Sequence, residues 1–250
     1  MAAAVLLALL ALTGAAPPDE PQRPHVEKVG PGRYRVGTVM LDARTKTVRL
    51  QGKVNMDEGG PIELLACLPE GKVHESVFVV ECRPMDLQVA LLLLGRSAGR
   101  NPAFQYAEGD PDRDKPPGDP LWVLAEWEEE ADGGKQHRRE RAERFLYNVQ
   151  RDTPLQHAEW TFLGSEMFRE GFGAELTGTV ITTYHDPVAV LELAHETVRD
   201  DIFYHVNDKL CPERDTPVEL IVRVPPEPEE SNNTKGEREH DERQHEEESE

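Results

Sequence analysis

The sequence has few cysteines. Cys67, Cys82 and Cys211 are the three in 250 residues, and no two form a Cys-x-x-Cys pair. An iron–sulfur cluster normally needs about four closely spaced thiolates, so the chain lacks that ligand set. A buried thiol, a disulfide and metal ligation all stay open, because Cys67 and Cys82 lie in neighbouring apolar segments that we expect to pair as strands.

Positive charge and long apolar runs are also scarce. The chain has 28 Lys and Arg against 48 Asp and Glu, which gives a formal net charge of −20. Nucleic acids bind electropositive surfaces, so we expect no nucleic-acid partner. The apolar run at residues 2–12 is shorter than the roughly 20 residues that cross a bilayer, so we expect no membrane span.

Motifs that carry known chemistry are missing as well. The sequence contains no His-Glu-x-x-His zinc motif and no Gly-x-Ser-x-Gly nucleophile elbow. Its glycines form no phosphate-cradling loop. We therefore expect no cofactor, and neither a nucleoside triphosphate site nor a dinucleotide site.

The amino end is typical of a secretory signal. The apolar run is followed by the small residues Thr13, Gly14 and Ala15, and then by a proline-containing polar stretch. This pattern predicts a signal peptide at residues 1–15 and a linker at residues 16–30, although no Lys or Arg precedes the apolar run. The expected location is periplasmic or secreted.

The carboxyl end has the composition of a disordered tail. Residues 225–250 contain eleven Asp or Glu against three Lys or Arg, with no aliphatic or aromatic residue. Such a segment cannot bury enough apolar surface to offset the entropy of ordering. The sequence thus predicts a disordered acidic tail at residues 225–250 and a single domain at residues 31–224.

Short apolar runs dominate that domain. Alternation around a polar turn at residues 43–46 predicts a hairpin over residues 32–56, and two runs at 61–68 and 74–82 predict further strands of one antiparallel sheet. The remaining expected elements are helices at 87–94 and 187–193, a surface loop at 96–120, a segment laid on the sheet at 136–149, and strands at 121–128, 160–163, 176–184 and 218–224. Together they predict an α+β fold, a mostly antiparallel sheet with a few packed helices.

Several stretches carry a resemblance to a known family. They include GKVNMDEGGPIELLACLPEGKVHES (residues 52–76), LWVLAEW (121–127), WTFLGS (160–165) and LTGTVITTYHDPVAVLEL (176–193). In these stretches the chain resembles the bacterial YdjY-domain family. The resemblance implies an exported bacterial protein, and the family has no established activity that could be carried over to this chain.

The sharpest candidate site is His74 with Glu75, which follow a turn at the start of an expected strand. On a strand the two side chains would point to opposite faces. His74 could then act as a general base or metal ligand with a distant partner such as Cys67 or Asp57. The alternative is structural, with His74 bonded to the turn and Glu75 anchoring a neighbouring strand.

A second polar corner is His185-Asp186-Pro187. Both His185 and Asp186 are candidates to join a site with His74. Asp186 directly before a proline also suits the N-cap of a helix with proline in its first turn, which is the structural alternative.

Two function classes remain open from the sequence. The first is a noncatalytic binding or assembly module of the bacterial cell envelope, in which sheet edges or the loop at residues 96–120 contact another envelope protein. The second is a metal-dependent or acid–base enzyme centred on His74. A concave pocket around His74 with several ligand side chains would favour the enzyme, and a solvent-facing turn would favour the binding module.

Overall fold

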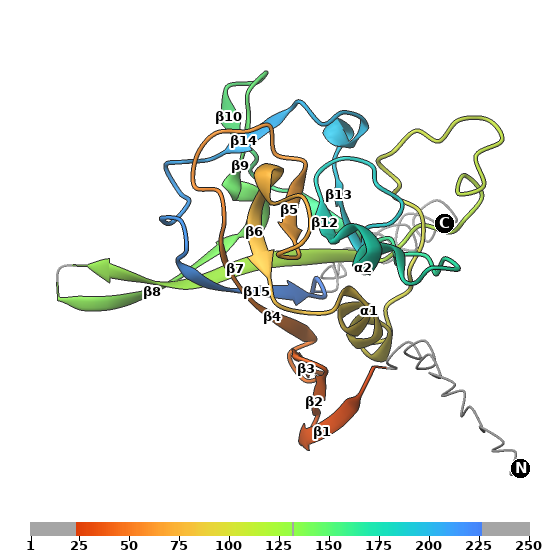
Figure 1. Ribbon diagram of the computed structural model, residues 1–250, viewed down its shortest axis with the longest axis horizontal. Helices are drawn as coiled ribbons and strands as arrows, with labels where there is room; N and C mark the ends of the chain where they lie inside the picture. Colours follow the sequence, from red (N-terminus) through yellow and green to blue (C-terminus); the bar gives the residue numbers. More distant parts are fainter. Residues whose placement is uncertain (1–23, 132, 227–250) are drawn as a thin grey trace, which may run out of the picture.

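The computed structural model describes residues 24–131 and 133–226 (Figure 1). The predicted signal peptide at residues 1–15 and residues 227–250 of the predicted tail lie outside them. No helix among the described residues is both long and apolar enough to cross a membrane.

Strands are the main regular secondary structure of the described chain. Those of the large sheet are β1 (Val26–Gly30), β2 (Arg33–Val36), β3 (Val39–Asp42), β4 (Thr47–Val54), β5 (Leu64–Cys67), β6 (Ser76–Val80), β7 (Pro120–Ala131), β8 (Gly134–Arg141), β11 (Glu159–Phe162), β12 (Thr179–Thr182), β13 (Leu191–Ala194) and β15 (Pro217–Arg223). A smaller sheet contains β9 (Leu146–Asn148), β10 (Thr153–Pro154) and β14 (Tyr204–Val206).

Eight strands of the large sheet close into a barrel. Their order is β4-β15-β7-β11-β13-β12-β5-β6, and β6 completes the ring by pairing with β4. The strands β1 to β3 extend the sheet from β4, and β8 extends it from β7. Closure leaves the barrel strands without a free edge, so the free edges of the large sheet occur on these extensions.

The barrel interior is filled by large apolar side chains. Trp160, Phe78, Phe162 and Leu50 are fully buried. Every residue of β5, β6 and β12 is buried, as expected for strands covered on both faces. Each of these short apolar runs in the sequence corresponds to one strand that crosses the barrel once.

The prediction of an α+β fold was wrong. The described residues form a mostly β protein with two α-helices, α1 (Pro84–Leu93) and α2 (Gly173–Thr177). The helix expected at residues 187–193 is absent, because residues 187–190 form a turn and Leu191–Ala194 becomes β13, hydrogen-bonded between β11 and β12. Pairing with two neighbouring strands outweighs the helix propensity of this leucine-rich segment.

Three further expectations were wrong. Residues 136–149 do not lie on the sheet as one segment; they contain the end of the β7–β8 hairpin, the 3₁₀-helix η2 (Ala142–Phe145) and β9. Residues 61–68 and 74–82 do contain strands, but β5 and β6 are parallel. The last part of the expected linker forms β1, which pairs with β2.

Other elements confirm their predictions. The hairpin within residues 32–56 is present as β3 and β4, and four predicted strands correspond to β7, β11, β12 and β15. Residues 96–119 form a long connection without a named strand or helix. Helix α1 ends at Leu93 and is followed, after Leu94, by Gly95. The φ of Gly95 is left-handed at 75° and its amide donates to the Leu92 carbonyl, as expected for a glycine that terminates a helix.

Two parallel strand pairs lie next to each other in the barrel. β5 and β6 are joined by the crossover at residues 68–75, and β12 and β13 by the crossover at residues 183–190. The pairs meet through β5 and β12, which are antiparallel. Parallel neighbours usually need a longer connection, often a helix. The first crossover contains His74 and Glu75, and the second contains His185 and Asp186.

Candidate functional site

His74 lies on the surface of the first crossover, and the neighbouring Glu75 is largely buried. They belong to the 3₁₀-helix η1 (Val73–Glu75) and not to a strand, so they do not point to opposite faces as expected. The His74 side chain is 78% exposed, and its Nε2 lies 3.8 Å from Glu75 Oε2. A substrate or metal at His74 would meet mainly solvent.

Lys72 organises this crossover. Its ammonium lies 2.7 Å from Glu63 and 3.1 Å from Glu75, and 5.7 Å from the centre of the Tyr184 ring. Partial burial acts to lower the pKa of Lys72, but hydrogen bonds to the two carboxylates outweigh it and raise the pKa above its ordinary value. Because Tyr184 belongs to the second crossover, Lys72 joins the two connections.

The other side chains considered as company for His74 do not assemble around it. Cys67 is buried between strands, and Asp57 accepts a hydrogen bond from the Arg214 amide. Within residues 24–131 and 133–226, no group of three His, Cys, Asp or Glu side chains is arranged to hold a metal ion.

His185 forms a buried pair with a carboxylate that sequence reasoning did not identify. Its Nδ1 lies 3.1 Å from both carboxylate oxygens of Glu192, which is fully buried on β13. Glu192 also accepts hydrogen bonds from Asn101 Nδ2 at 2.6 Å and from the Asp186 amide at 2.9 Å. One carboxylate thus joins the long loop, the second crossover and the barrel.

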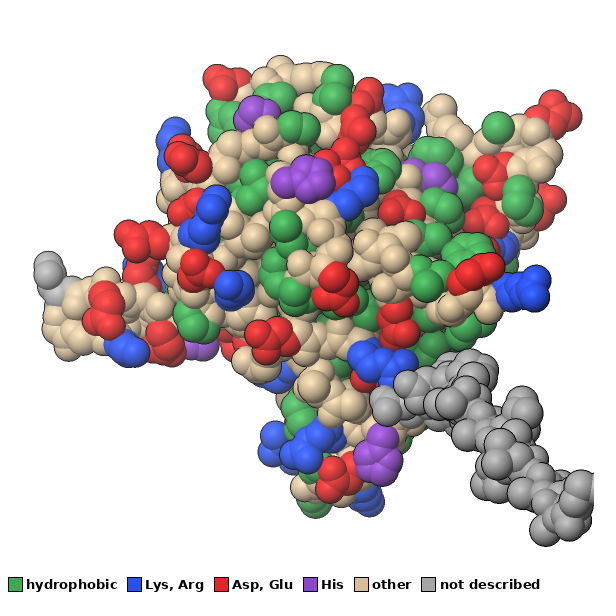
Figure 2. Space-filling view, in the orientation of Figure 1, with side chains coloured by type: hydrophobic (Ala, Val, Ile, Leu, Met, Phe, Trp, Pro, Cys, Tyr) green, Lys and Arg blue, Asp and Glu red, His purple; other side chains and the backbone are tan. Residues whose placement is uncertain are grey.

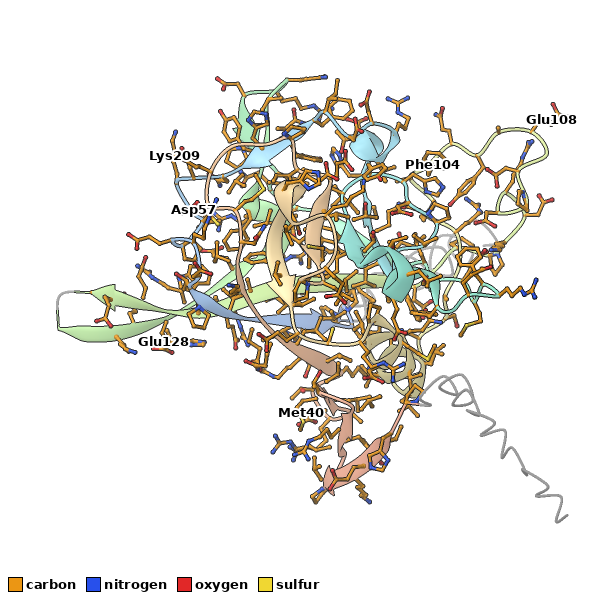
Figure 3. The ribbon with its side chains drawn as sticks, viewed as in Figure 1. Met40, Asp57, Phe104, Glu108, Glu128 and Lys209 are labelled. Carbon is orange, nitrogen blue, oxygen red and sulfur yellow. The ribbon has the colours of Figure 1, made fainter. Side chains whose placement is uncertain are left out.

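Two aromatic rings from the long loop cover His185. Phe104 stacks on the imidazole with ring centres 3.7 Å apart, and Tyr106 meets it edge-on at 5.4 Å. Figure 3 labels Phe104 near the base of this loop and Glu108 toward its tip. The Tyr106 hydroxyl accepts a hydrogen bond from the Asn101 amide at 3.0 Å. These contacts fix the loop onto the barrel.

The space beside His185 is small. A cavity of about 20 Å³ lies between His185, Tyr106, Lys115 and Glu166. This volume accommodates about one water molecule and no larger substrate. A carboxylate-bound imidazole can take up and release a proton, but its surroundings here are those of a loop anchor.

Both members of the His185–Glu192 pair have raised pKa values. Burial alone would lower the pKa of His185, but the hydrogen bond and charge of Glu192 raise it above its ordinary value. Burial raises the pKa of Glu192 in turn, despite the opposing effects of His185 and Asn101. Both shifts favour the protonated state of the pair.

Asp186 caps a turn instead of a helix. Its Oδ1 accepts a hydrogen bond from the Val188 amide at 3.1 Å, and its carbonyl accepts one from the Ala189 amide at 3.0 Å. The predicted capping interaction is therefore present, while the helix that it was expected to begin is not.

The three cysteines are free thiols. Cys67 and Cys82 are buried, and Cys211 is partly buried. Burial raises the pKa of Cys82 and of Cys211 to about 12 in each case. Thiols with such raised pKa values are poor nucleophiles and metal ligands near neutral pH.

A projecting hairpin is a feature that sequence reasoning missed. Strands β7 and β8 form a long arm that extends away from the barrel (Figure 1). A signal was available, because Asp132-Gly133-Gly134 lies between two strongly charged stretches and Asp-Gly is a common hairpin turn. The charged residues on either side obscured the strand pattern.

A basic pocket is a second missed feature. It has a volume of about 410 Å³ and lies on the outer face of β4, β15 and β7. Five cationic side chains line it: Arg44, Lys46, Arg49, Arg139 and Arg223. These residues are far apart in sequence, so no local pattern could have grouped them.

The fold defines a β-barrel protein with two short parallel crossovers and a projecting hairpin. A family model for the YdjY domain matches residues 39–223. The match spans most of the chain, which therefore belongs to the YdjY-domain family, and the resemblance in the sequence is confirmed. Comparison with curated proteins finds no match, and comparison with solved structures finds none.

Proposed function

We propose that this YdjY-domain protein is an exported, noncatalytic binding module of the bacterial cell envelope, and that its β7–β8 arm holds another envelope protein. The single observation that carries the proposal is the free edge of β8. In the described chain, β8 pairs with β7 on one side and with no strand on the other. Such an edge offers backbone donors and acceptors to an added strand.

The outer part of the arm is not needed for the barrel. β7 pairs with β15 only as far as Trp127, and residues beyond it pair with β8 alone. Residues 128–131 and 134–139 are exposed. In Figure 2 the arm projects at the left of the molecule and carries acidic and basic side chains. The outer arm can therefore be exposed without loss of barrel stability. Recognition elements are commonly found in such exposed segments.

The charges of the arm indicate the chemistry of the partner. Strand β8 carries more basic than acidic side chains, with Lys135, Arg138 and Arg139 against Glu140. Strand β7 places acidic residues such as Glu126 opposite these basic residues. A strand added to the other edge of β8 would meet the same basic side chains. Like charges directly opposite destabilise a sheet, so a second copy of β8 is disfavoured and an acidic extended segment is favoured.

The enzyme alternative receives less support from the geometry. His74 lies on an exposed turn beside one carboxylate, Glu75. A general base or ligand normally lies in a concave site that excludes water and brings several groups together. The exposure of His74 therefore favours the binding module.

Site-specific photo-crosslinking tests the proposal. The probe is a photo-crosslinking amino acid in place of Gln136 on β8. The control places the same amino acid at Glu27 on β1, an exposed strand at the end of the other extension of the sheet. We expect a discrete adduct from position 136 in cells and none from position 27. Mass spectrometry should place the crosslink in an acidic segment of an envelope protein.

A shortened arm provides the matched variant. Replacement of residues 129–136 by Asn-Gly removes three cross-strand pairs and leaves Glu128 opposite His137. The thermal midpoint should be retained and the adduct from a probe placed at His137 lost. Equal crosslinking from β1 and β8 would contradict the proposal. So would an uncleaved amino terminus of this protein in the crosslinked adduct, in place of one near Ala16.

A further inference from the structure

The basic pocket lies where three strands present their outer faces side by side. In the sheet register, Ile221 of β15 lies between Arg49 of β4 and Leu124 of β7. Arg223 is two residues further along β15, on the same face. The turn between β3 and β4 closes this end with Arg44 and Lys46.

Positive charge is unevenly distributed along the pocket. Arg49 forms ion pairs with Glu126 and Glu219, and Arg139 also binds Glu126. At the other end, Arg44 is paired with Asp42, while Arg223 is exposed and forms no ion pair with any described residue.

Among the described residues, no carboxylate forms an ion pair with the Arg223 guanidinium group at this end of the pocket. A guanidinium binds carboxylate and phosphate oxygens through two parallel hydrogen bonds.

The floor of the pocket is apolar. Ile221 lies on an outer face of the sheet and yet is 1% exposed, and Leu124 beside it is half-buried. An outward position on a strand that neighbours solvent is more often polar. A cation-lined rim above an aliphatic floor suits a ligand that has one charged end and an apolar body.

We infer that this pocket binds a small organic anion, a carboxylate or phosphate monoester that carries an apolar group. The anionic end contacts Arg223 and Arg44, and the apolar group lies on Leu124, beside the almost fully covered Ile221. The volume of about 410 Å³ is within the range of small-molecule sites. The net charge of −20 disfavours long polyanions, but screening over about 8 Å leaves the local guanidinium groups dominant for a small ion.

The inference is independent of the function proposed for the arm. The pocket uses Arg139, which the shortened arm retains, and the free edge of β8 does not depend on Arg223. Anion binding by the shortened-arm variant, or partner capture by an Arg223 variant, therefore separates the two.

Titrations of the full chain with three probes test the pocket. Phenyl phosphate has both a charged end and an apolar body. Inorganic phosphate has only the charged group, and benzyl alcohol has only the apolar ring. In two-dimensional amide NMR spectra, we expect phenyl phosphate to shift the resonances of residues 44–49 and 221–224. Its affinity should be at least about tenfold higher than that of either partial probe, which corresponds to about 1.4 kcal/mol.

Matched arginine variants assign the binding to the pocket. Arg223→Gln should weaken phenyl phosphate about tenfold, because one charge-assisted bidentate contact is lost. Arg169→Gln is the control, since Arg169 is also exposed and without an ion pair to the described residues. Equal weakening by both variants, shifts outside the pocket, or equal affinity for phenyl phosphate and inorganic phosphate would each overturn the inference.

Discussion

The two crossovers of the barrel each connect a pair of parallel strands, but their environments differ. Each leaves a strand, returns to pair with a parallel neighbour, and contains a histidine followed by an acidic residue. His74 in the first is exposed, whereas His185 in the second is covered by Phe104 and bonded to buried Glu192. A dipeptide of ionisable residues therefore does not determine its own role.

The difference arises from what surrounds each crossover. The strand after the first crossover, β6, has the sequence SVFVV and contains no carboxylate, while β13 has the sequence LELA and contains Glu192. The long loop packs on the second crossover through Asn101 and Phe104. A histidine in a crossover acts as a structural anchor where a buried carboxylate binds it and a loop covers it, as at His185.

The largest effect is expected when the buried carboxylate is changed. Glu192→Gln preserves the shape of the side chain but removes the charge that His185, Asn101 and the Asp186 amide share. We expect a loss of about 2–3 kcal/mol, because hydrogen bonds to a buried charged group are lost. For a domain of this size, thermal denaturation should show a midpoint lower by roughly 4–12 °C.

Glu75→Gln in the first crossover is the matched control for this change. The Glu75 side chain is 13% exposed, but its partners Lys72 and His74 are 44% and 78% exposed, so we expect their ion pairs to contribute about 1 kcal/mol. Similar losses in the two variants would show that the crossovers are equally important for stability, and the comparison would fail.

The pH dependence of stability is the next effect. The folded state raises the pKa of His185 above its ordinary value of 6.5 and raises that of Glu192 as well, so the folded protein binds protons more tightly than the unfolded chain. The contribution of His185 is fully present below pH 6.5 and is lost as the pH rises through the pKa of His185 in the folded state. The contribution of Glu192 has the same sign but is fully present only below pH 4.5. Urea denaturation on both sides of the His185 range measures the contribution of His185.

A difference between variants isolates the contribution of this pair. Burial lowers the pKa of His195, so that residue contributes in the opposite direction as the pH rises. The free energy of unfolding of wild type minus that of His185→Gln should fall as the pH rises. If the His185 difference is flat, the pair does not titrate as its environment predicts.

Local patterns predicted many elements but not their partners. Short runs rich in valine and leucine located β7, β11 and β15, and Gly95 located the end of α1. Closure of the barrel depends on pairs such as β4 with β6 and β5 with β12, which local alternation does not encode. The segment that forms β13 was assigned to a helix because its apolar residues do not distinguish between the two periods.

The candidate site was predictable only in part. His185 and Asp186 stood out as a polar corner, but Asn101 is 91 residues away from Glu192 in the sequence and meets it only through folding. The pocket residues Arg49 and Arg223 likewise come together across paired strands. The arm was also missed, although its Asp-Gly turn is visible in the sequence.

The smallest effect is expected at His74. His74→Asn removes an imidazole whose side chain is 78% exposed and whose ionisable neighbour is Glu75 at 3.8 Å. Surface substitutions of this kind change stability by less than about 0.5 kcal/mol. Thermal denaturation with and without Zn²⁺, Mn²⁺ or Ca²⁺ distinguishes a surface residue from a ligand. A metal at one hundred times its dissociation constant stabilises a folded protein by about 2.7 kcal/mol, and we expect no such gain in either form. A gain in wild type that His74→Asn abolishes would make His74 a ligand, and the first crossover would then be the functional one.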